Sequence, residues 1–164
     1  MMRMRNLLMC TAAMAVSLVL ASASVAQQRP AAKPAGPEPN PRTVRFGVWD
    51  NSTNPNNVMT YEKDGKDGSK LTVSNPSDHS KDWSYSTEFD GVFRPVAGQP
   101  GSETAVEIIN PKSIRILNKR DGVVNQVVIN TVSDDLNTIH NEYIRLDKDG
   151  KIMGVTHVDY IRRK

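Results

Sequence analysis

Two histidines and two carboxylates stand close together near the end of the chain, in HNEYIRLDKDGKIMGVTHVDY, residues 140–160. His140 is two positions before Glu142, and His157 is two positions before Asp159. Imidazole nitrogens and carboxylate oxygens are ligands of zinc and other divalent metals, and both groups can also move protons. This histidine–carboxylate cluster predicts a metal or catalytic site, the polar face of a hairpin, or a polar patch at the mouth of a ligand-binding barrel.

The turn in DKDG, residues 147–150, decides which of these side chains face each other. If its last two residues form a two-residue turn, His140 lies opposite Asp159 and Glu142 lies opposite His157. If all four form the loop, His140 lies opposite His157. In both registers the four groups share one face, because side chains two positions apart on a strand point the same way. Polar pairs of this kind are ordinary on the wet face of a sheet. We therefore expect polar pairing with no bound metal and no cofactor, and keep a metal-dependent enzyme as an alternative.

The chain from residue 43 onward reads almost entirely as short strands. WSYSTEF, residues 83–89, alternates apolar and polar side chains, which is the period of a strand with one buried face. No segment shows the long helical period and the capping residues of an amphipathic α-helix. Other strands, rich in β-branched residues, are predicted at 43–49, 69–73, 104–109, 113–119, 123–132, 138–146 and 151–161.

Five Asp-Gly pairs punctuate these strands, at 64–65, 67–68, 90–91, 121–122 and 149–150. This dipeptide accepts the positive φ angles of tight hairpin turns, so each pair indicates a short connection between antiparallel neighbours. About eight to ten strands joined by hairpins make an up-and-down meander, and such a sheet loses its exposed edges only by closing. The predicted fold class is therefore all-β, a small antiparallel barrel. A sandwich is disfavoured because it usually needs longer crossing connections.

The most apolar stripe of this barrel predicts either a binding pocket or a filled core. Trp83, Tyr85 and Phe89 share one face of their strand, and in a barrel they are joined by Val106, Ile108, Ile114, Ile116, Val127 and Ile129. These side chains would line a pocket for a hydrophobic molecule or would fill the interior, because barrels of about eight strands can be packed solid. The sequence leaves both interpretations open.

Residues 1–26 have the composition of a cleaved signal peptide. Two arginines precede an apolar run of about 14 residues, and small residues follow before a cleavage predicted after Ala26, or alternatively after Ala23. The run is shorter than the roughly 20 residues that span a bilayer, so we expect no membrane span after cleavage. Cys10 would be removed with the signal, which leaves the mature protein without a thiol.

Residues 27–42, QQRPAAKPAGPEPNPR, form a Pro- and Ala-rich linker. The segment has five prolines and no large apolar residue, so it cannot bury surface and is expected to be extended. The remaining residues, 43–164, are sufficient for one domain with a modest core.

The excess of basic residues does not predict a nucleic-acid partner. The full sequence has a net charge of +3, but 19 basic and 18 acidic residues remain once the two signal-peptide arginines are removed. A nucleic-acid binder needs basic residues concentrated on one face, and here lysines and aspartates alternate through the turns. The one basic cluster, residues 162–164, is predicted to be a solvated tail.

A family resemblance is carried by the stretch YSTEFDGVFRPVAGQPGSETAVEIINPKSIRILNKRDGVV, residues 85–124, together with GVW at 47–49 and VSDDLNTI at 132–139. This pattern resembles the secreted lipocalin-like proteins of Gram-negative and related bacteria, a calycin-type β-barrel family. The positions that match its central motif are Phe89, Asp90, Gly91, Pro95, Val96, Gly98 and Pro100. The resemblance implies a barrel able to hold a small apolar ligand, in which Trp49 closes the base and Gly47 makes room for it.

We therefore expect an exported protein, periplasmic or extracellular, that binds a small hydrophobic molecule and catalyses no reaction. One alternative is an interaction or structural module of the cell envelope, with a filled barrel and an envelope protein as partner. The other is a metal-dependent enzyme that uses the histidine–carboxylate cluster. The volume and lining of the barrel interior distinguish ligand binding from the first alternative.

Overall fold

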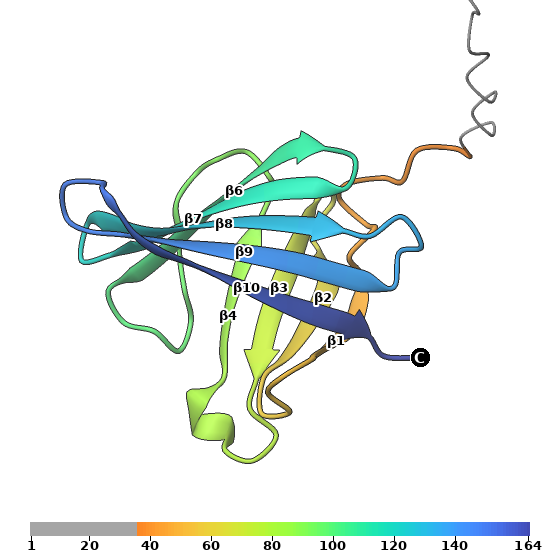
Figure 1. Cartoon of the computed structure of the whole chain (residues 1–164), viewed down its shortest axis with the longest axis horizontal. Helices are drawn as coiled ribbons and strands as arrows, with labels where there is room; N and C mark the ends of the chain where they lie inside the picture. The colour runs from red at the N-terminus through yellow and green to blue at the C-terminus, as the bar shows by residue number, and fades with distance from the viewer. Residues whose placement is uncertain (1–35) are drawn as a thin grey trace, which may run out of the picture. The chain divides into compact units, whose positions relative to one another are not determined.

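Ten antiparallel strands make up most of residues 36–164, the part of the chain that the computed structural model describes (Figure 1). The strands are β1 (Gly47–Asn51), β2 (Val58–Asp64), β3 (Gly68–Ser74), β4 (Trp83–Thr87), β5 (Arg94–Pro95), β6 (Ser102–Asn110), β7 (Ser113–Arg120), β8 (Val123–Val132), β9 (Thr138–Leu146) and β10 (Ile152–Arg162). One short 3-10 helix, η1 (His79–Lys81), precedes β4. The predicted signal peptide and residues 27–35 of the predicted linker lie outside the described residues. In the described part, no helix has the length and apolar character needed to cross a membrane.

The strands form an up-and-down meander that curls into a nearly closed barrel. Their order in the sheet is β4-β3-β2-β1-β10-β9-β8-β7-β6-β5, and every neighbouring pair is antiparallel. The gap between β4 and β5 is bridged where Ser84 and Ala97 exchange two backbone hydrogen bonds of 3.0 and 2.8 Å. The amide of Gly91 also donates to the carbonyl of Val106 at 3.0 Å. The predicted fold class is confirmed.

Residues 95–100, part of the motif that resembles lipocalin-like proteins, make this closure possible. Val96 is buried, and Gly98 has a φ of +83°. A Cβ at Gly98 would lie 2.4 Å from the carbonyl oxygen of Asp82. Any other residue would therefore push this segment away from β4, because real Cβ atoms do not approach backbone so closely.

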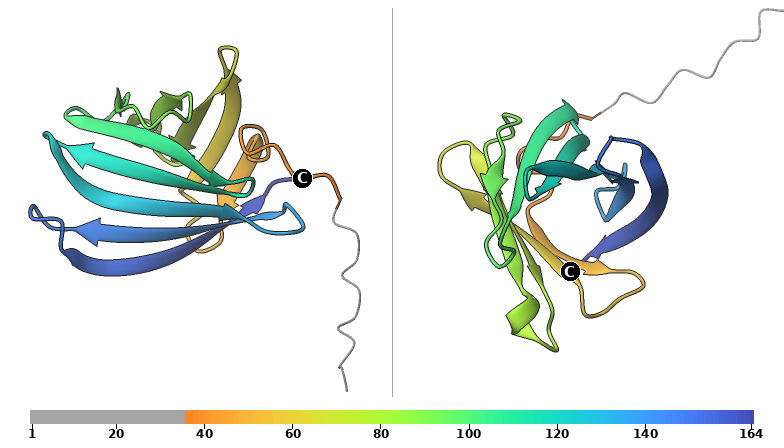
Figure 2. Two further views of the ribbon diagram at one scale, coloured as in Figure 1. Left: turned by 90° about the horizontal axis from the view of Figure 1, so that it is seen from above. Right: turned by 90° about the vertical axis from the view of Figure 1, so that its left-hand side faces the viewer.

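The barrel has two unlike ends (Figures 1 and 2). The closed end carries the C-terminus, the N-terminal segment 36–46, and the turns at 65–67, 111–112 and 133–137. The open end carries the loops at 52–57 and 75–82, and the turns at 121–122 and 147–151. Arg120 pairs with Val123, so the Asp-Gly pair between them forms the predicted two-residue turn.

At the start of the domain the observed strands differ from the predicted ones. The first strand begins at Gly47 rather than at residue 43, because the chain before it turns: the amide of Val44 donates to the carbonyl of Asn40, and that of Phe46 donates to the carbonyl of Thr43. Strand β2, VMTYEKD, was not predicted. It contributes Met59 and Tyr61 to the interior.

Strand β8 presents other residues to the interior than the predicted Val127 and Ile129. Val128, Asn130 and Val132 are buried, and Val128 pairs with the buried Ile116 of β7. Val127 and Ile129 therefore lie on the outer face and do not line the interior. The sequence VVNQVVINTV has apolar residues at both parities, so its pattern could not decide which set points inward.

Candidate functional site

Trp49 fills the closed end of the barrel. Its side chain is fully buried, and its indole N–H donates to the carbonyl of Arg45 at 2.7 Å. The Arg162 guanidinium lies 4.0 Å from the centre of the ring, a cation–π contact. Arg162 also donates to the carbonyls of Val44 and Phe46, at 2.8 and 2.6 Å. Strand β10 is thus tied to the N-terminal turn across the tryptophan, and Arg162 is not the solvated tail residue that was predicted.

The family resemblance implied that Gly47 makes room for Trp49, but the side chain that approaches Gly47 is that of Arg162. The φ of Gly47 is +123°, and a Cβ at this position would lie 3.1 Å from Nη1 of Arg162. The backbone conformation and the close approach of the guanidinium both favour glycine here.

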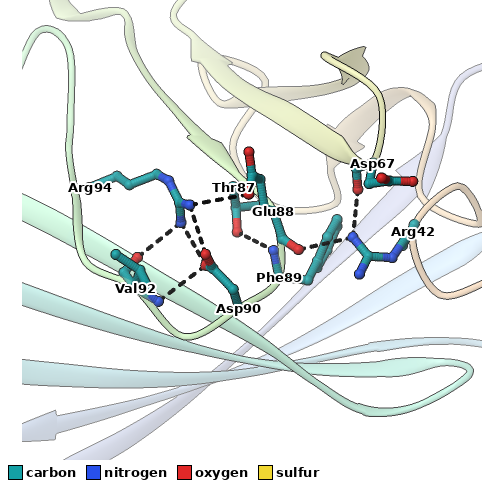
Figure 3. A network of polar contacts seen from close by, with 8 residues as sticks. All are labelled: Arg42, Asp67, Thr87, Glu88, Phe89, Asp90, Val92 and Arg94. Carbon is teal, nitrogen blue, oxygen red and sulfur yellow. Dashed lines mark hydrogen bonds and ion pairs between the residues drawn. The ribbon is translucent and has the colours of Figure 1, made fainter.

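A polar network fastens the gap between β4 and β5 at the closed end (Figure 3). Arg94 forms a two-pronged ion pair with Asp90, at 2.7 and 2.8 Å, and this pairing lowers the pKa of the Asp90 carboxyl. Arg42 donates to the carbonyl of Glu88 at 2.9 Å, and its guanidinium lies 5.5 Å from the centre of the Phe89 ring. The Phe-Asp-Gly turn of the family-like motif is thereby held against the N-terminal segment.

The open half of the barrel encloses a cavity of about 420 Å³. Small-molecule sites usually have volumes of about 300–1,000 Å³, so the space is sufficient for a compact ligand. Every strand except β5 contributes to the lining, which combines apolar, aromatic, amide and charged side chains.

One part of the cavity wall is apolar. Residues of β2, β3 and β4 stand side by side here, because Met59 pairs with Val73 and Val73 pairs with Trp83. The Trp83 ring stacks on Tyr85, with centroids 6.3 Å apart. Together with residues of β10 and of the segment after β5, the apolar lining comprises Met59, Val73, Trp83, Val96 and Val158.

Another part of the wall, on β6, β7 and β8, is made of hydrogen-bonded polar side chains. The Thr104 hydroxyl donates to Oδ1 of Asn118 at 2.8 Å, and Nδ2 of Asn118 donates to Oε1 of Gln126 at 2.8 Å. All three residues line the cavity. The amide NH₂ of Gln126 ends this chain, so the wall offers a hydrogen-bond donor to the interior.

All four tyrosines of the chain contribute to the interior: Tyr61, Tyr85, Tyr143 and Tyr160. Burial raises the pKa of Tyr61 to about 12. Burial also raises the pKa of Tyr85 and of Tyr143, and neighbouring tyrosines add to both increases. These three phenols are therefore neutral at physiological pH and act as hydrogen-bonding groups.

A chain of hydrogen bonds connects the closed end to the cavity. Arg45, only 1% exposed, donates from Nε to Oδ1 of Asn130 at 2.7 Å. Nδ2 of Asn130 donates to Oδ1 of Asn141 at 2.7 Å, and Nδ2 of Asn141 donates to the Tyr143 hydroxyl at 2.9 Å. The hydroxyls of Tyr143 and Tyr160 lie 3.4 Å apart, and both residues line the cavity.

Charged residues also contribute to the lining. Lys119 forms an ion pair with Glu103 at 3.2 Å, and its ammonium group lies 3.8 Å from the centre of the Phe93 ring. Arg120, which is exposed at the end of β7, adds a second cation. The charged groups of the cavity thus gather next to the turn at 121–122, at the mouth.

The histidine–carboxylate cluster lies on the outer face of β9 and β10, away from the cavity. His140 is opposite Asp159, with Nδ1 and Oδ1 2.8 Å apart, and Glu142 is opposite His157. This is the first of the two predicted registers, although an irregularity between Ile152 and Gly154 makes the connecting turn longer than two residues. Within residues 36–164, no group of three or more His, Cys, Asp or Glu side chains is placed so that it could hold a metal ion. His140 and Asp159 form an exposed cross-strand polar pair, and the half-buried Glu142 lies opposite the exposed His157.

Of the nine residues predicted to line a pocket, Trp83 alone reaches the cavity. Five others belong to the buried core: Tyr85, Phe89, Val106, Ile114 and Ile116. Ile108 pairs with Ile114 near the closed end, where its side chain is 36% exposed. Val127 and Ile129 lie on the outer face, as described above.

The sequence interpretation missed most of the cavity lining. Met59 lies on the unpredicted strand β2, although the alternation in VMTYEKD could have revealed it. Asn118 and Gln126 were missed because polar residues in a strand usually indicate the solvent face. Tyr143 and Tyr160 share the inner face of the last hairpin. The prediction for this hairpin concerned the histidine–carboxylate cluster, which lies on its outer face.

Two solved structures share the fold of this barrel. A fatty acid binding protein of Schistosoma mansoni, solved in complex with arachidonic acid, superposes with a TM-score of 0.57 over 76% of this chain and 100% of that chain, at 12% sequence identity. The fluorescent protein UnaG gives a TM-score of 0.51 over 72% of this chain and 96% of that chain, also at 12% identity. No protein-family model and no characterised protein matches the sequence. The fold is an antiparallel β-barrel similar to the barrels of these two proteins.

Proposed function

We propose that this protein is an exported, non-enzymatic binding protein that holds a small hydrophobic molecule in the open half of its barrel. The cavity of about 420 Å³, with its apolar wall, is the observation that carries this proposal. The proposal is supported by the fold that this protein shares with a fatty acid binding protein solved in complex with arachidonic acid. A pocket with apolar walls and a few convergent polar groups is typical of small-molecule sites.

The alternative of a filled barrel agrees less well with the interior. The closed half is packed by Trp49, Ile114, Val132 and Ile139, all almost completely buried. The open half contains the cavity, which no side chain of residues 36–164 fills. A purely structural module would gain nothing from this space, because unfilled cavities destabilise a fold.

Export is supported by the signal-peptide composition of residues 1–26. We place the mature protein, beginning at Gln27, in the periplasm or outside the cell. Amino-terminal sequencing of the protein recovered from periplasmic and culture fractions tests this. Recovery from the cytoplasmic fraction with residues 1–26 retained would contradict it.

Ligand binding is tested by native mass spectrometry of protein purified gently from its host, followed by displacement of a fluorescent fatty-acid analogue. We expect a bound mass and a saturable displacement. Val158→Phe should abolish both, because Val158 lines the cavity. Val155→Phe is the matched control, since Val155 is exposed three residues away on the same strand. Absence of any bound mass and of any displacement in the unaltered protein would overturn the proposal.

A further inference from the structure

We infer that the ligand presents a neutral hydrogen-bond acceptor, such as a ketone or ester oxygen, to the hydroxyl pair of Tyr143 and Tyr160. This inference rests on the proposed function of the open half as a ligand site. It specifies the chemistry of the molecule beyond its being hydrophobic.

Arg45 determines which groups donate and which accept along the chain of buried hydrogen bonds. A guanidinium carries five N–H donors and no acceptor, so Oδ1 of Asn130 must be the group that faces Nε of Arg45. Nδ2 of Asn130 then donates to Oδ1 of Asn141, which leaves Nδ2 of Asn141 to donate to the Tyr143 hydroxyl. Each amide in the chain is thus fixed in one orientation and passes a donor toward the cavity.

The hydroxyls of Tyr143 and Tyr160 stand at the end of this chain of hydrogen bonds, and one of their two hydrogens has no acceptor in it. Tyr143 already accepts from Asn141, and the two hydroxyls, 3.4 Å apart, can form only one bond with each other. Among the hydrogen bonds of residues 36–164, neither hydroxyl donates to any further group. Whichever tyrosine donates to the other, the remaining O–H hydrogen is directed at a partner outside the protein, and both residues line the cavity.

The polar wall of the cavity adds a second donor of the same kind. The chain from Thr104 through Asn118 ends on Oε1 of Gln126, so its free group is the Gln126 NH₂. Two separate hydrogen-bond chains therefore present donors to one cavity. A buried donor without an acceptor is costly, and a ligand oxygen supplies the acceptor.

The acceptor is neutral because, among the cavity-lining residues of 36–164, no cation stands beside the hydroxyl pair. Arg45 is absent from the cavity lining, and its guanidinium is engaged by Asn130 and by the carbonyls of Pro41 and Lys112. The cations of the lining, Lys119 and Arg120, stand at the mouth. Burying a carboxylate without a charged partner is unfavourable, so a carboxylate would bind at the mouth, and the inner position suits an uncharged oxygen.

Three naphthalene probes that share a 2-dimethylamino group test the inference: the 6-propionyl ketone, the 6-propyl compound without an oxygen, and the 6-carboxylate. We expect the double variant Tyr143→Phe/Tyr160→Phe to bind the ketone about five- to tenfold more weakly than the unaltered protein, the loss of one hydrogen bond. Its affinity for the propyl compound should be unchanged. Tyr85→Phe is the matched control, because Tyr85 is buried outside the cavity lining.

Infrared spectroscopy of the ketone bound to the unaltered protein needs no variant. We expect its carbonyl stretch at a lower frequency than in hexane, and a hexane-like frequency would overturn the inference. Equal losses of ketone and propyl affinity in the double variant would do the same. Carboxylate binding tighter than ketone binding, and lost in the double variant, would overturn the neutral character of the acceptor. If neither the ketone nor the propyl compound binds the unaltered protein, the proposed function fails as well.

Discussion

The closed and open ends of this barrel are built from the same strands but have opposite interiors. At the closed end Trp49 is completely buried, and Arg45 and Arg162 use their donors on carbonyl and amide oxygens. At the open end Trp83 lines a cavity, and Arg120 lies exposed at its mouth. Strand alternation determines which side chains point inward at both ends. Whether the interior is full depends on the size of those side chains and on the N-terminal segment that closes only one end.

The two tryptophans of the chain give the largest expected contrast. Trp49→Ala should lower the free energy of unfolding by about 3–5 kcal/mol, because it empties the packed closed end and removes the partner of Arg162. Trp83→Ala should cost about half as much, because that ring already borders a cavity. Urea denaturation followed by circular dichroism measures both. Equal costs would erase the distinction between the two ends.

Replacing an arginine should also destabilise the protein more at the closed end than at the open end. Arg45→Met leaves Oδ1 of Asn130 without its donor and the Lys112 carbonyl with the Val132 amide as its remaining donor, and should destabilise the protein by about 2–4 kcal/mol. Arg120→Met, at the open end, should change stability by less than about 0.5 kcal/mol. The unfolding midpoints of the two variants in urea test this. A comparable shift in both would contradict the account of Arg45.

The buried tyrosines should make the protein sensitive to alkaline pH. The pKa of Tyr61 is raised by burial to about 12 in the folded state, against about 10 in an unfolded chain. A folded-state pKa above the unfolded value gives stability that is present below about pH 10 and is lost as the pH rises toward 12. The loss for Tyr61 is on the order of 2–3 kcal/mol.

Tyr61→Phe should flatten this alkaline dependence of the unfolding free energy. Absorbance at 295 nm, which follows phenolate formation, should show the ionisation of Tyr61, Tyr85 and Tyr143 only as the barrel unfolds, since the pKa of each is raised. Ionisation of these three tyrosines near pH 10 in the folded protein would show that they are not buried as described.

A glycine at each end of the barrel should respond differently to substitution by alanine. Gly47→Ala should cost about 1–2 kcal/mol, because alanine is strained at a φ of +123° and its Cβ would crowd Arg162. Gly154→Ala, at the open end of β10, should change stability by less than about 0.5 kcal/mol, since nothing lies within 4 Å of an added Cβ. Thermal unfolding distinguishes the two. A neutral Gly47→Ala would show that the contact with Arg162 does not constrain this position.

The smallest effect is expected on the outer face. The double variant His140→Ala/Asp159→Asn should change the unfolding free energy by less than about 0.5 kcal/mol, as is typical of exposed cross-strand pairs. It should leave the affinity for the fluorescent fatty-acid analogue unaltered, because the cluster lies outside the cavity. A large loss of either property would reopen a functional role for these residues.

Local chemistry in the sequence was sufficient to predict the architecture. The Asp-Gly turns and the alternation in WSYSTEF led to the meander, and the need to cover its exposed edges led to the barrel. The cavity could not be predicted in the same way. Asn118 and Gln126 have the composition of a solvent face, and only the register of β7 with β8 turns them inward. Arg162 likewise resembled a tail residue until the fold brought Trp49 beneath it.

The proposed ligand binds at the open end and leaves the closed end undisturbed. The most direct test titrates a bromine-labelled alkyl methyl ketone into two single-tryptophan variants, Trp49→Phe and Trp83→Phe, while tryptophan fluorescence is recorded. Bromine quenches tryptophan fluorescence only on near contact. We therefore expect strong, saturable quenching of Trp83 fluorescence and none of Trp49 fluorescence. Quenching of Trp49, or no quenching of Trp83 at saturation, would contradict it.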